Sequence, residues 1–321
     1  MKRRTVLSAT LVLSATAALP ALAQDAWPSR AVKFVCNFPA GGPLDVLARA
    51  VADVLQRELK QPFVVENKAG AGGNIGADAV AKADADGYTV LFGIDSTFTV
   101  NPHIYKSMAF KPADLRPLVI VSSSGLLLGA NPASGFRTLA DLVAAGKDKG
   151  VTFSSAGSGS PGHLAAAMAI DATGMKITHV PYKGNAPAVT AVLSGEVTGG
   201  VLATPGMLPH VKAGKITALA VTSSKRSQLA PDVPTVAEAG LPQLEQEVLY
   251  LAMLPAGTPE PVAQAVQKAI AEAVVRPEIK TRLASLDMHY EGTAGAAAGK
   301  RLVALSDRYG SVIRKTGMRV E

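Results

Sequence analysis

The sequence predicts an α/β fold of two domains, each built on an open sheet, with two strands crossing between them. Three observations predict this architecture. Short apolar runs of β type alternate with helical patterns along almost the whole chain, as in folds with helices on both faces of a sheet. The apolar run at residues 118–130 is unusually long for one strand, and is long enough to cross between domains. A second run at 248–254 can carry the chain back.

The predicted strands are rich in β-branched and aromatic residues and lie between turn-forming residues. In chain order they are 31–38, 63–67, 88–94, 118–130, 151–155, 177–182, 197–204, 216–222, 248–254 and 288–291. The helix at Pro43–Leu59 has an apolar stripe at helical spacing, and Thr138 with Asp141 forms a capping box that opens the next helix. Further helices are expected at 163–173, 186–194 and 259–275. Pro277 separates two helices in the C-terminal segment, and the last helix starts at 294–299.

The two crossings divide the chain. Residues 126–247 are predicted to form an inserted domain, and residues 24–125 together with 248–321 form the other. The alternation of strand and helix predicts parallel sheets in both.

The N-terminus is predicted to be an export signal, residues 1–23. Lys2, Arg3 and Arg4 precede an apolar stretch, and residues 21–23 form a small-x-small cleavage site that ends at Ala23. The apolar stretch is too short for a membrane span. We therefore expect a periplasmic protein whose mature chain has 321 − 23 = 298 residues.

Composition excludes several classes of function. Loss of three basic residues with the signal lowers the formal net charge from +7 to +4, and aromatic residues make up only 5% of the chain, so nucleic acid is not an expected partner. The single cysteine, Cys36, sits in an apolar run, and the five histidines lack metal-site spacing. We expect no metal and no cofactor.

A glycine-rich junction lies between the first strand and the first helix. Gly41 and Gly42 precede Pro43, which suits the first helical position, and Asp45 favours the positive end of the helix dipole. Unpaired N–H groups at a helix start can hold an anion, and bare glycines let a ligand reach the N–H groups of Gly41 and Gly42. A tight turn capped by Asp45 explains the same residues without a ligand.

A second junction of this kind spans residues 154–163, with four serines, three glycines and Pro161 in the first helical turn. Under the two-domain reading, both junctions lie at carboxyl ends of strands in different domains, where ligands of open α/β sheets bind. The rival motifs fit poorly: residues 70–76 have the wrong spacing for a dinucleotide fingerprint, and the serines form no nucleophile elbow.

Motifs along nearly the whole mature chain resemble the Bug family, the periplasmic receptors of tripartite tricarboxylate transporters. They include Phe-Pro-Ala-Gly-Gly-Pro-Leu-Asp from Phe38, Glu-Asn-Lys-Ala-Gly-Ala-Gly-Gly-Asn from Glu66, His-Val-Pro-Tyr-Lys-Gly from His179, and Pro-Ala-Gly-Thr-Pro from Pro255. The resemblance implies a two-domain periplasmic-binding-protein (Venus-flytrap, type II) fold with open sheets and a two-strand hinge. It also implies a monomer that closes on a small organic carboxylate, a di- or tricarboxylate or an aromatic acid, in part through bound water, and delivers it to a membrane permease.

The family's ligand-binding positions can be carried over by motif. On the first domain they are Phe38, Ala40, Gly41, Gly42 and Asp45, with Ser96 and Thr97 on the floor of the cleft. On the second they are Ser155, Ala156, Gly157, Ser158, Ser160 and Thr204. Tyr182 and Lys183 are expected to support the hinge-side wall.

Departures from the family pattern bear on the ligand. Residues 199–205 lack the acid that many relatives carry near the end of this strand, which argues against an amino acid that needs an ammonium partner. Two other functions stay open: a sensory receptor that acts on a histidine kinase, and an exported hydrolase that uses Ser158 or Ser160 with His163.

Overall fold

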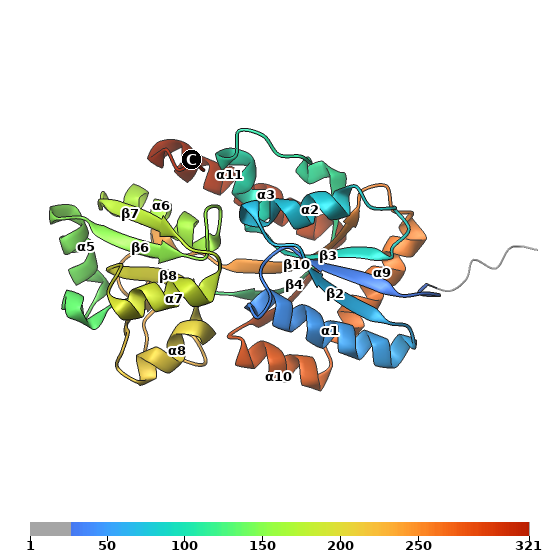
Figure 1. The fold of residues 1–321 in the computed structure, drawn as a ribbon, viewed down its shortest axis with the longest axis horizontal. Coiled ribbons are helices and arrows are strands. Elements are labelled where there is room, and N and C mark those ends of the chain that lie inside the picture. Colours follow the sequence, from blue (N-terminus) through green and yellow to red (C-terminus); the bar gives the residue numbers. More distant parts are fainter. Residues whose placement is uncertain (1–26, 321) are drawn as a thin grey trace, which may run out of the picture.

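The computed structural model describes residues 27–320, so the predicted signal segment lies outside the described residues. Figure 1 shows two α/β halves side by side, each with a sheet flanked by helices. The strands are β1 (Val32–Cys36), β2 (Phe63–Asn67), β3 (Thr89–Ile94), β4 (Leu115–Ser124), β5 (Leu126–Ala130), β6 (Val151–Ser155), β7 (Ile177–Pro181), β8 (Gly199–Ala203), β9 (Thr217–Val221), β10 (Val248–Pro255) and β11 (His289–Ala294).

The α-helices follow the strands along the chain. They are α1 (Pro43–Leu59), α2 (Asn74–Ala81), α3 (Ser96–Thr99), α4 (Asn101–Ile104), α5 (Leu139–Asp148), α6 (Pro161–Thr173), α7 (Asn185–Ser194), α8 (Thr204–Lys212), α9 (Glu260–Val274), α10 (Pro277–Ser285) and α11 (Gly295–Thr316). The capping box of Thr138 and Asp141 opens α5 as predicted. Short 3-10 turns lie at Ala71–Gly73, Pro112–Asp114, Pro132–Ser134 and Pro242–Leu244.

Both sheets are mixed, so the prediction of parallel sheets is wrong. The six-stranded sheet has the order β11-β4-β10-β3-β1-β2, and the five-stranded sheet has the order β7-β6-β8-β5-β9. Strand β10 runs antiparallel to β3, and β5 runs antiparallel to β8. The reason lies in the crossings. A strand that arrives from the other sheet enters at the carboxyl edge, so it must run against the parallel strands already there.

The long apolar run is two strands and not one. It breaks at Gly125 between β4, in the six-stranded sheet, and β5, in the five-stranded sheet. A Cβ on Gly125 would lie 2.9 Å from the backbone nitrogen of Ser223 and 2.5 Å from its Oγ, so only glycine fits this close approach. The chain returns to the six-stranded sheet through β10, where Val248 pairs with Ser124. The two crossings therefore lie side by side.

The predicted domain division at 125/126 and 247/248 stays a prediction. The six-stranded sheet contains only β1–β4, β10 and β11, and the five-stranded sheet contains only β5–β9. Helix α11 also reaches the five-stranded side, since it packs on α6 and Lys315 forms an ion pair with Asp171 at 3.6 Å. The two halves thus meet along α11 as well as at the crossing strands.

Buried strands hold both layers together. Every residue of β10 is buried, and β3 is buried from Val90 to Ile94, as expected for central strands covered by helices on both faces. Helix α1 packs the stripe that includes Leu47, Val51 and Leu55 onto this core. Among residues 27–320, none of the helices combines the length and the apolar composition that crossing a membrane requires.

Candidate functional site

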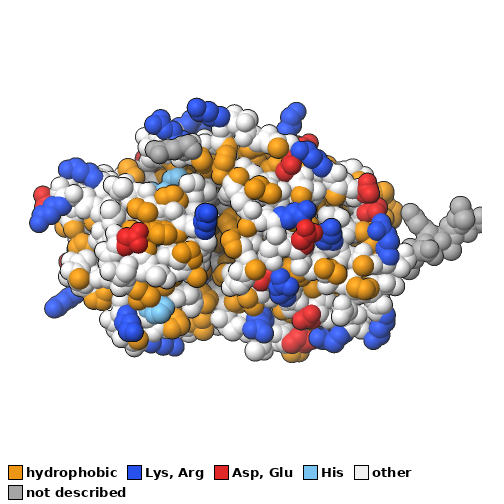
Figure 2. Space-filling model, in the orientation of Figure 1, with side chains coloured by type: hydrophobic (Ala, Val, Ile, Leu, Met, Phe, Trp, Pro, Cys, Tyr) orange, Lys and Arg blue, Asp and Glu red, His pale blue; other side chains and the backbone are white. Residues whose placement is uncertain are grey.

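A cavity of about 700 Å³ lies between the carboxyl edges of the two sheets. Figure 2 shows the corresponding furrow between the two halves, bordered by hydrophobic side chains. The walls come from the β1–α1 junction (38–44), the β6–α6 junction (156 and 160–162), the β7–α7 junction (183–187) and the β8–α8 junction (201–206), with Ile94, Leu126, Val189, Thr190, Leu193, His210, Val248, Tyr250 and Leu286.

Six of the predicted ligand-binding residues line this cavity, and they come from two junctions that are far apart in the sequence. On the six-stranded side they are Phe38, Ala40, Gly41 and Gly42, and on the five-stranded side they are Ala156 and Ser160. The other predicted residues, Asp45, Ser96, Thr97, Ser155, Gly157, Ser158 and Thr204, lie outside the lining.

The start of α1 is open towards the cavity. Gly42 is the N-cap residue and makes no side-chain cap hydrogen bond, and Pro43 takes the first helical position. Gly41 has a φ of 77°, a left-handed conformation that favours glycine. Its N–H donates to Asp45 Oδ2 at 2.9 Å, so the expectation that this N–H is free for a ligand is wrong.

Asp45 holds the junction together from behind the wall. Besides the N–H of Gly41, its carboxylate accepts hydrogen bonds from Arg49 Nε at 3.0 Å and Asn67 Nδ2 at 2.9 Å. Asn67 Nδ2 also donates to the carbonyl of Phe38 at 3.2 Å. Burial raises the pKa of Asp45, but the hydrogen bonds from Arg49, Gly41 and Asn67 outweigh it and hold that pKa below the usual range.

Replacing Asp45 with asparagine is expected to lower the free energy of unfolding at pH 7 by about 1–3 kcal/mol, because charge-assisted hydrogen bonds are lost in a buried site. A carboxyl whose folded pKa is lowered stabilises the fold above its unfolded pKa, and this contribution disappears as pH falls through the folded pKa. Urea unfolding at pH 7 and pH 3 measures both effects. A difference between wild type and variant that is the same at both pH values would contradict this account.

The start of α6 faces the cavity from the other sheet. Ser160 is its N-cap residue, is 1% exposed, and makes no side-chain cap hydrogen bond. Within residues 27–320 its Oγ has no hydrogen-bond partner. A buried hydroxyl without a partner is unfavourable, so this one is available to a bound group.

The rest of this junction supports Ser160. Ser155 Oγ lies 2.6 Å from His179 Nε2, and the N–H of Gly159 donates to His163 Nδ1 at 3.2 Å. The two imidazole rings stack with centroids 3.8 Å apart. Burial lowers the pKa of His163 to about 3, with a contribution from the neighbouring His179, and burial lowers the pKa of His179 to about 4. Both rings are therefore neutral at pH 7.

Four further predicted residues lie behind the walls. Thr97 Oγ1 donates to the carbonyl of Gly72 at 3.0 Å and accepts from Asn37 Nδ2 at 3.0 Å, so it braces the 70–73 turn. Ser96 and Thr204 are 2% and 1% exposed, and neither side-chain oxygen has a hydrogen-bond partner within the described chain. Ser158 lies close to the 70–73 turn: a Cβ added to Gly72 would lie 3.2 Å from the carbonyl oxygen of Ser158.

Sequence reasoning missed the third junction. Gly184 and Asn185 follow β7 and open α7, as Gly41 and Gly42 do before α1, and Asn185 Oδ1 accepts the N–H of Ala203 at 3.0 Å. Lys183, expected only to support the wall, lines the cavity itself. The same pattern of a strand, a glycine and a helix start is present in the sequence here and could have identified this junction.

Four helix N-termini thus open on one cavity: those of α1, α6, α7 and α8. Its described lining contains no Asp or Glu, and the basic residues there are Lys183 and His210. Helix N-termini carry partial positive charge and unpaired N–H groups, so this cavity favours an anion. In the part of the chain that the structure describes, no group of three or more His, Cys, Asp or Glu is placed to hold a metal ion.

Comparison with known proteins agrees with this geometry. Residues 47–318 match the family model described as the tripartite tricarboxylate transporter family receptor. The chain belongs to this family. It is a solute-binding receptor of this class, with the periplasmic-binding-protein fold that its sequence motifs predicted. The resemblance to the Bug family is confirmed: protein BugT of Bordetella pertussis is 38% identical over 268 residues, 82% of this receptor and 82% of that protein.

Solved structures of similar proteins support the same assignment. The R. palustris protein Rpa4515 with adipate superposes with a TM-score of 0.85 at 31% identity, covering 91% of this receptor and 99% of that chain. MatC from Rhodopseudomonas palustris with bound malate superposes with a TM-score of 0.82 at 27% identity, covering 89% and 100%. The periplasmic binding protein BugD gives a TM-score of 0.83 at 30% identity, covering 92% and 100%.

Proposed function

We propose that this receptor captures a small organic carboxylate reversibly between its two sheets and delivers it to the membrane permease subunits of a tripartite tricarboxylate transporter. One observation carries the proposal: helix N-termini from both sheets face one cavity, and the Ser160 hydroxyl there is buried without a partner. The adipate and malate bound by the two R. palustris proteins support a carboxylate as the ligand.

Neutral donors explain how the site holds an anion and still releases it. Backbone N–H groups and a hydroxyl form charge-assisted hydrogen bonds to a carboxylate. They do so without burying an ion pair, whose desolvation costs several kcal/mol. The predicted residues Gly42, Ala156 and Ser160 are the proposed direct or water-mediated contacts, and Asp45, Thr97 and Ser155 hold the loops that carry them.

We infer from the predicted segments how the receptor is exported and how it closes on its ligand. The chain is exported with cleavage after Ala23 and acts as a monomer in the periplasm. Ligand binding brings the inserted domain, residues 126–247, towards the domain formed by 24–125 and 248–321. Movement at the adjacent crossing strands would close the cavity around the carboxylate.

The arrangement of serines favours binding without catalysis. His163 Nδ1 accepts the N–H of Gly159, and Ser160 Oγ has no partner within the described chain, so no hydrogen bond joins Ser160 to His163. Ser155 does contact His179, but its Oγ donates to the carbonyl of Gly157 at 3.0 Å and lies outside the cavity lining, which argues against a nucleophile. Labelling by a serine-reactive probe would overturn this inference.

Replacing Ser160 with alanine is expected to weaken carboxylate binding about 10- to 100-fold, because one hydrogen bond to a charged group is worth about 1.5–3 kcal/mol. The measurement is calorimetric titration of refolded, ligand-free protein with adipate, malate, hexanoate and benzoate. The exposed Ser224→Ala variant is the control and is expected to bind like wild type. If none of the acids binds wild type, the proposed function fails.

A further inference from the structure

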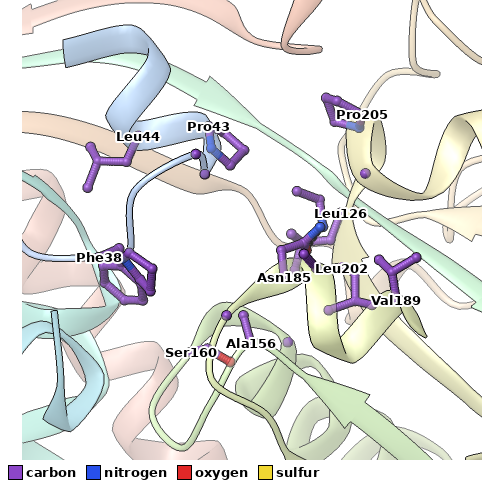
Figure 3. A pocket seen from close by; sticks show the side chains of 18 of the residues that line it. Phe38, Pro43, Leu44, Leu126, Ala156, Ser160, Asn185, Val189, Leu202 and Pro205 are labelled. Atoms are coloured by element: carbon purple, nitrogen blue, oxygen red, sulfur yellow. Dashed lines mark hydrogen bonds between the residues drawn. The ribbon is translucent and has the colours of Figure 1, made fainter. Parts of the chain in front are cut away.

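The side walls of the cavity are apolar on both sides. Figure 3 shows Phe38 and Pro43 on one side of the space above Ser160 and Leu126 and Leu202 on the other. Leu44 and Val189 line the same cavity. Ile94, Val248 and Leu286 add further apolar surface. A ligand whose carboxylate reaches Ser160 therefore has its remaining atoms between hydrocarbon and aromatic side chains.

Three polar side chains in these walls, those of Asn185, Thr190 and Tyr250, already use their oxygen atoms in hydrogen bonds within the protein. Asn185 Oδ1 accepts the N–H of Ala203 at 3.0 Å, and Thr190 Oγ1 donates to the carbonyl of Ala186 at 3.2 Å. The Tyr250 hydroxyl lies 3.2 Å from Ser124 Oγ, which leaves its ring as the surface that lines the cavity. A hydroxyl or ammonium group in the middle of the ligand would lose water and find few replacements.

We propose that the preferred ligand is an acid with one carboxylate and an apolar body, aliphatic or aromatic, that extends between Phe38 on one wall and Leu126, Leu202 and Val189 on the other. This inference rests on the proposed function, since it assumes that the carboxylate binds at Ser160. It separates this receptor from one that selects a diacid, a hydroxy acid or an amino acid.

The expected binding free energies favour a ligand whose far end is apolar over one that carries a second charge there. Lys183 is an exposed cation in the wall, and exposed ion pairs are worth little because water screens them. Each methylene group moved from water into an apolar site strengthens binding about fourfold. A second carboxylate would have to give up its hydration next to the same apolar walls, with the N-termini of α7 and α8 as the remaining groups in the lining that favour an anion.

The test is a series of four acids that share one six-carbon chain and differ at its far end: hexanoate, 6-hydroxyhexanoate, 6-aminohexanoate and adipate. Calorimetric titration of the whole mature chain is expected to give the tightest binding for hexanoate. The three polar-ended acids should bind at least about tenfold more weakly, because each buries a polar group without a partner. Butyrate should bind about fifteenfold more weakly than hexanoate, because two methylene groups are lost.

A variant of the cavity wall tests the same proposal by changing the protein and not the ligand. Phe38→Ala is expected to weaken hexanoate binding about tenfold or more and to reduce the difference between hexanoate and butyrate, since part of the apolar wall is removed. Tyr290→Ala removes an exposed aromatic side chain from β11, outside the cavity, and is the matched control.

The outcomes separate the two proposals. If adipate binds as tightly as hexanoate or more tightly, the apolar-ended ligand is rejected and the carboxylate receptor stands. The same holds if chain length has no effect on affinity. If no acid binds and refolded protein shows a normal unfolding transition, the proposed function itself is rejected.

Discussion

Replacing Gly42 with valine is expected to lower the affinity for a bound carboxylate at least about 100-fold, a loss of about 2.7 kcal/mol. Gly42 is the N-cap residue of α1 and lines the cavity, with an ordinary φ of −77°. A Cβ there would meet only the Pro39 carbonyl oxygen, at 3.4 Å, so the fold has room for a side chain. The valine would instead fill ligand space and shield the first N–H groups of the helix.

The fold is expected to change little in this variant. Valine is a poorer N-cap than glycine by about 1 kcal/mol or less, which corresponds to a Tm lower by about 2–4 °C. The control is Gly299→Val in α11, where a Cβ has no heavy atom within 4 Å and the cavity is remote. Calorimetric titration and thermal unfolding of both variants measure the two effects. Normal affinity in a folded Gly42→Val protein would reduce the junction to a tight turn.

The sequence motifs at the junctions predicted where helices start, but not which atoms there are available to a ligand. The strand–glycine–proline pattern at 38–43 and the serine-rich pattern at 154–161 placed two helix starts correctly, because proline and glycine restrict the backbone locally. The same pattern did not reveal which atoms are free. Asp45, Thr97 and Ser155 have ligand-like side chains, but their oxygen atoms are hydrogen-bonded to Asn67, Gly72 and His179, which only the tertiary fold brings near.

Tertiary contacts also explain why one helix of the fold was not predicted from the sequence. Helix α8 contains Pro205, Gly206 and Pro209, which signal a loop when they are considered alone. Packing against α7, β5 and β8 stabilises it despite this composition. By contrast, α1, β2 and β6 begin and end where the pattern predicted, since their apolar residues and flanking turn residues agree.

Acidification from pH 7 to pH 4.5 is expected to destabilise the protein through the stacked His163–His179 pair. Both folded pKa values, about 3 and about 4, lie below the usual 6.5, so between these limits the unfolded chain binds protons that the folded chain does not. Stability therefore falls as pH drops below about 6.5. At pH 4.5 the pair contributes a loss of roughly 3–5 kcal/mol. Protonation of His163 Nδ1 would also break its bond from Gly159 and loosen the loop that carries Ser160.

Asp95 acts in the opposite direction, and the experiment must separate the two. Burial raises the pKa of Asp95 to about 6, so its folded form keeps a proton that the unfolded form loses, and it adds stability as pH falls below 6. Urea unfolding between pH 4.5 and 7 of wild type, His179→Gln and the control His289→Gln isolates the stacked pair. The glutamine at 179 retains a partner for Ser155 but cannot titrate, so the part of the pH dependence that the stacked pair contributes should fall by about half. An unchanged slope in His179→Gln, or an equal change in the control, would mean that the loss of stability arises elsewhere.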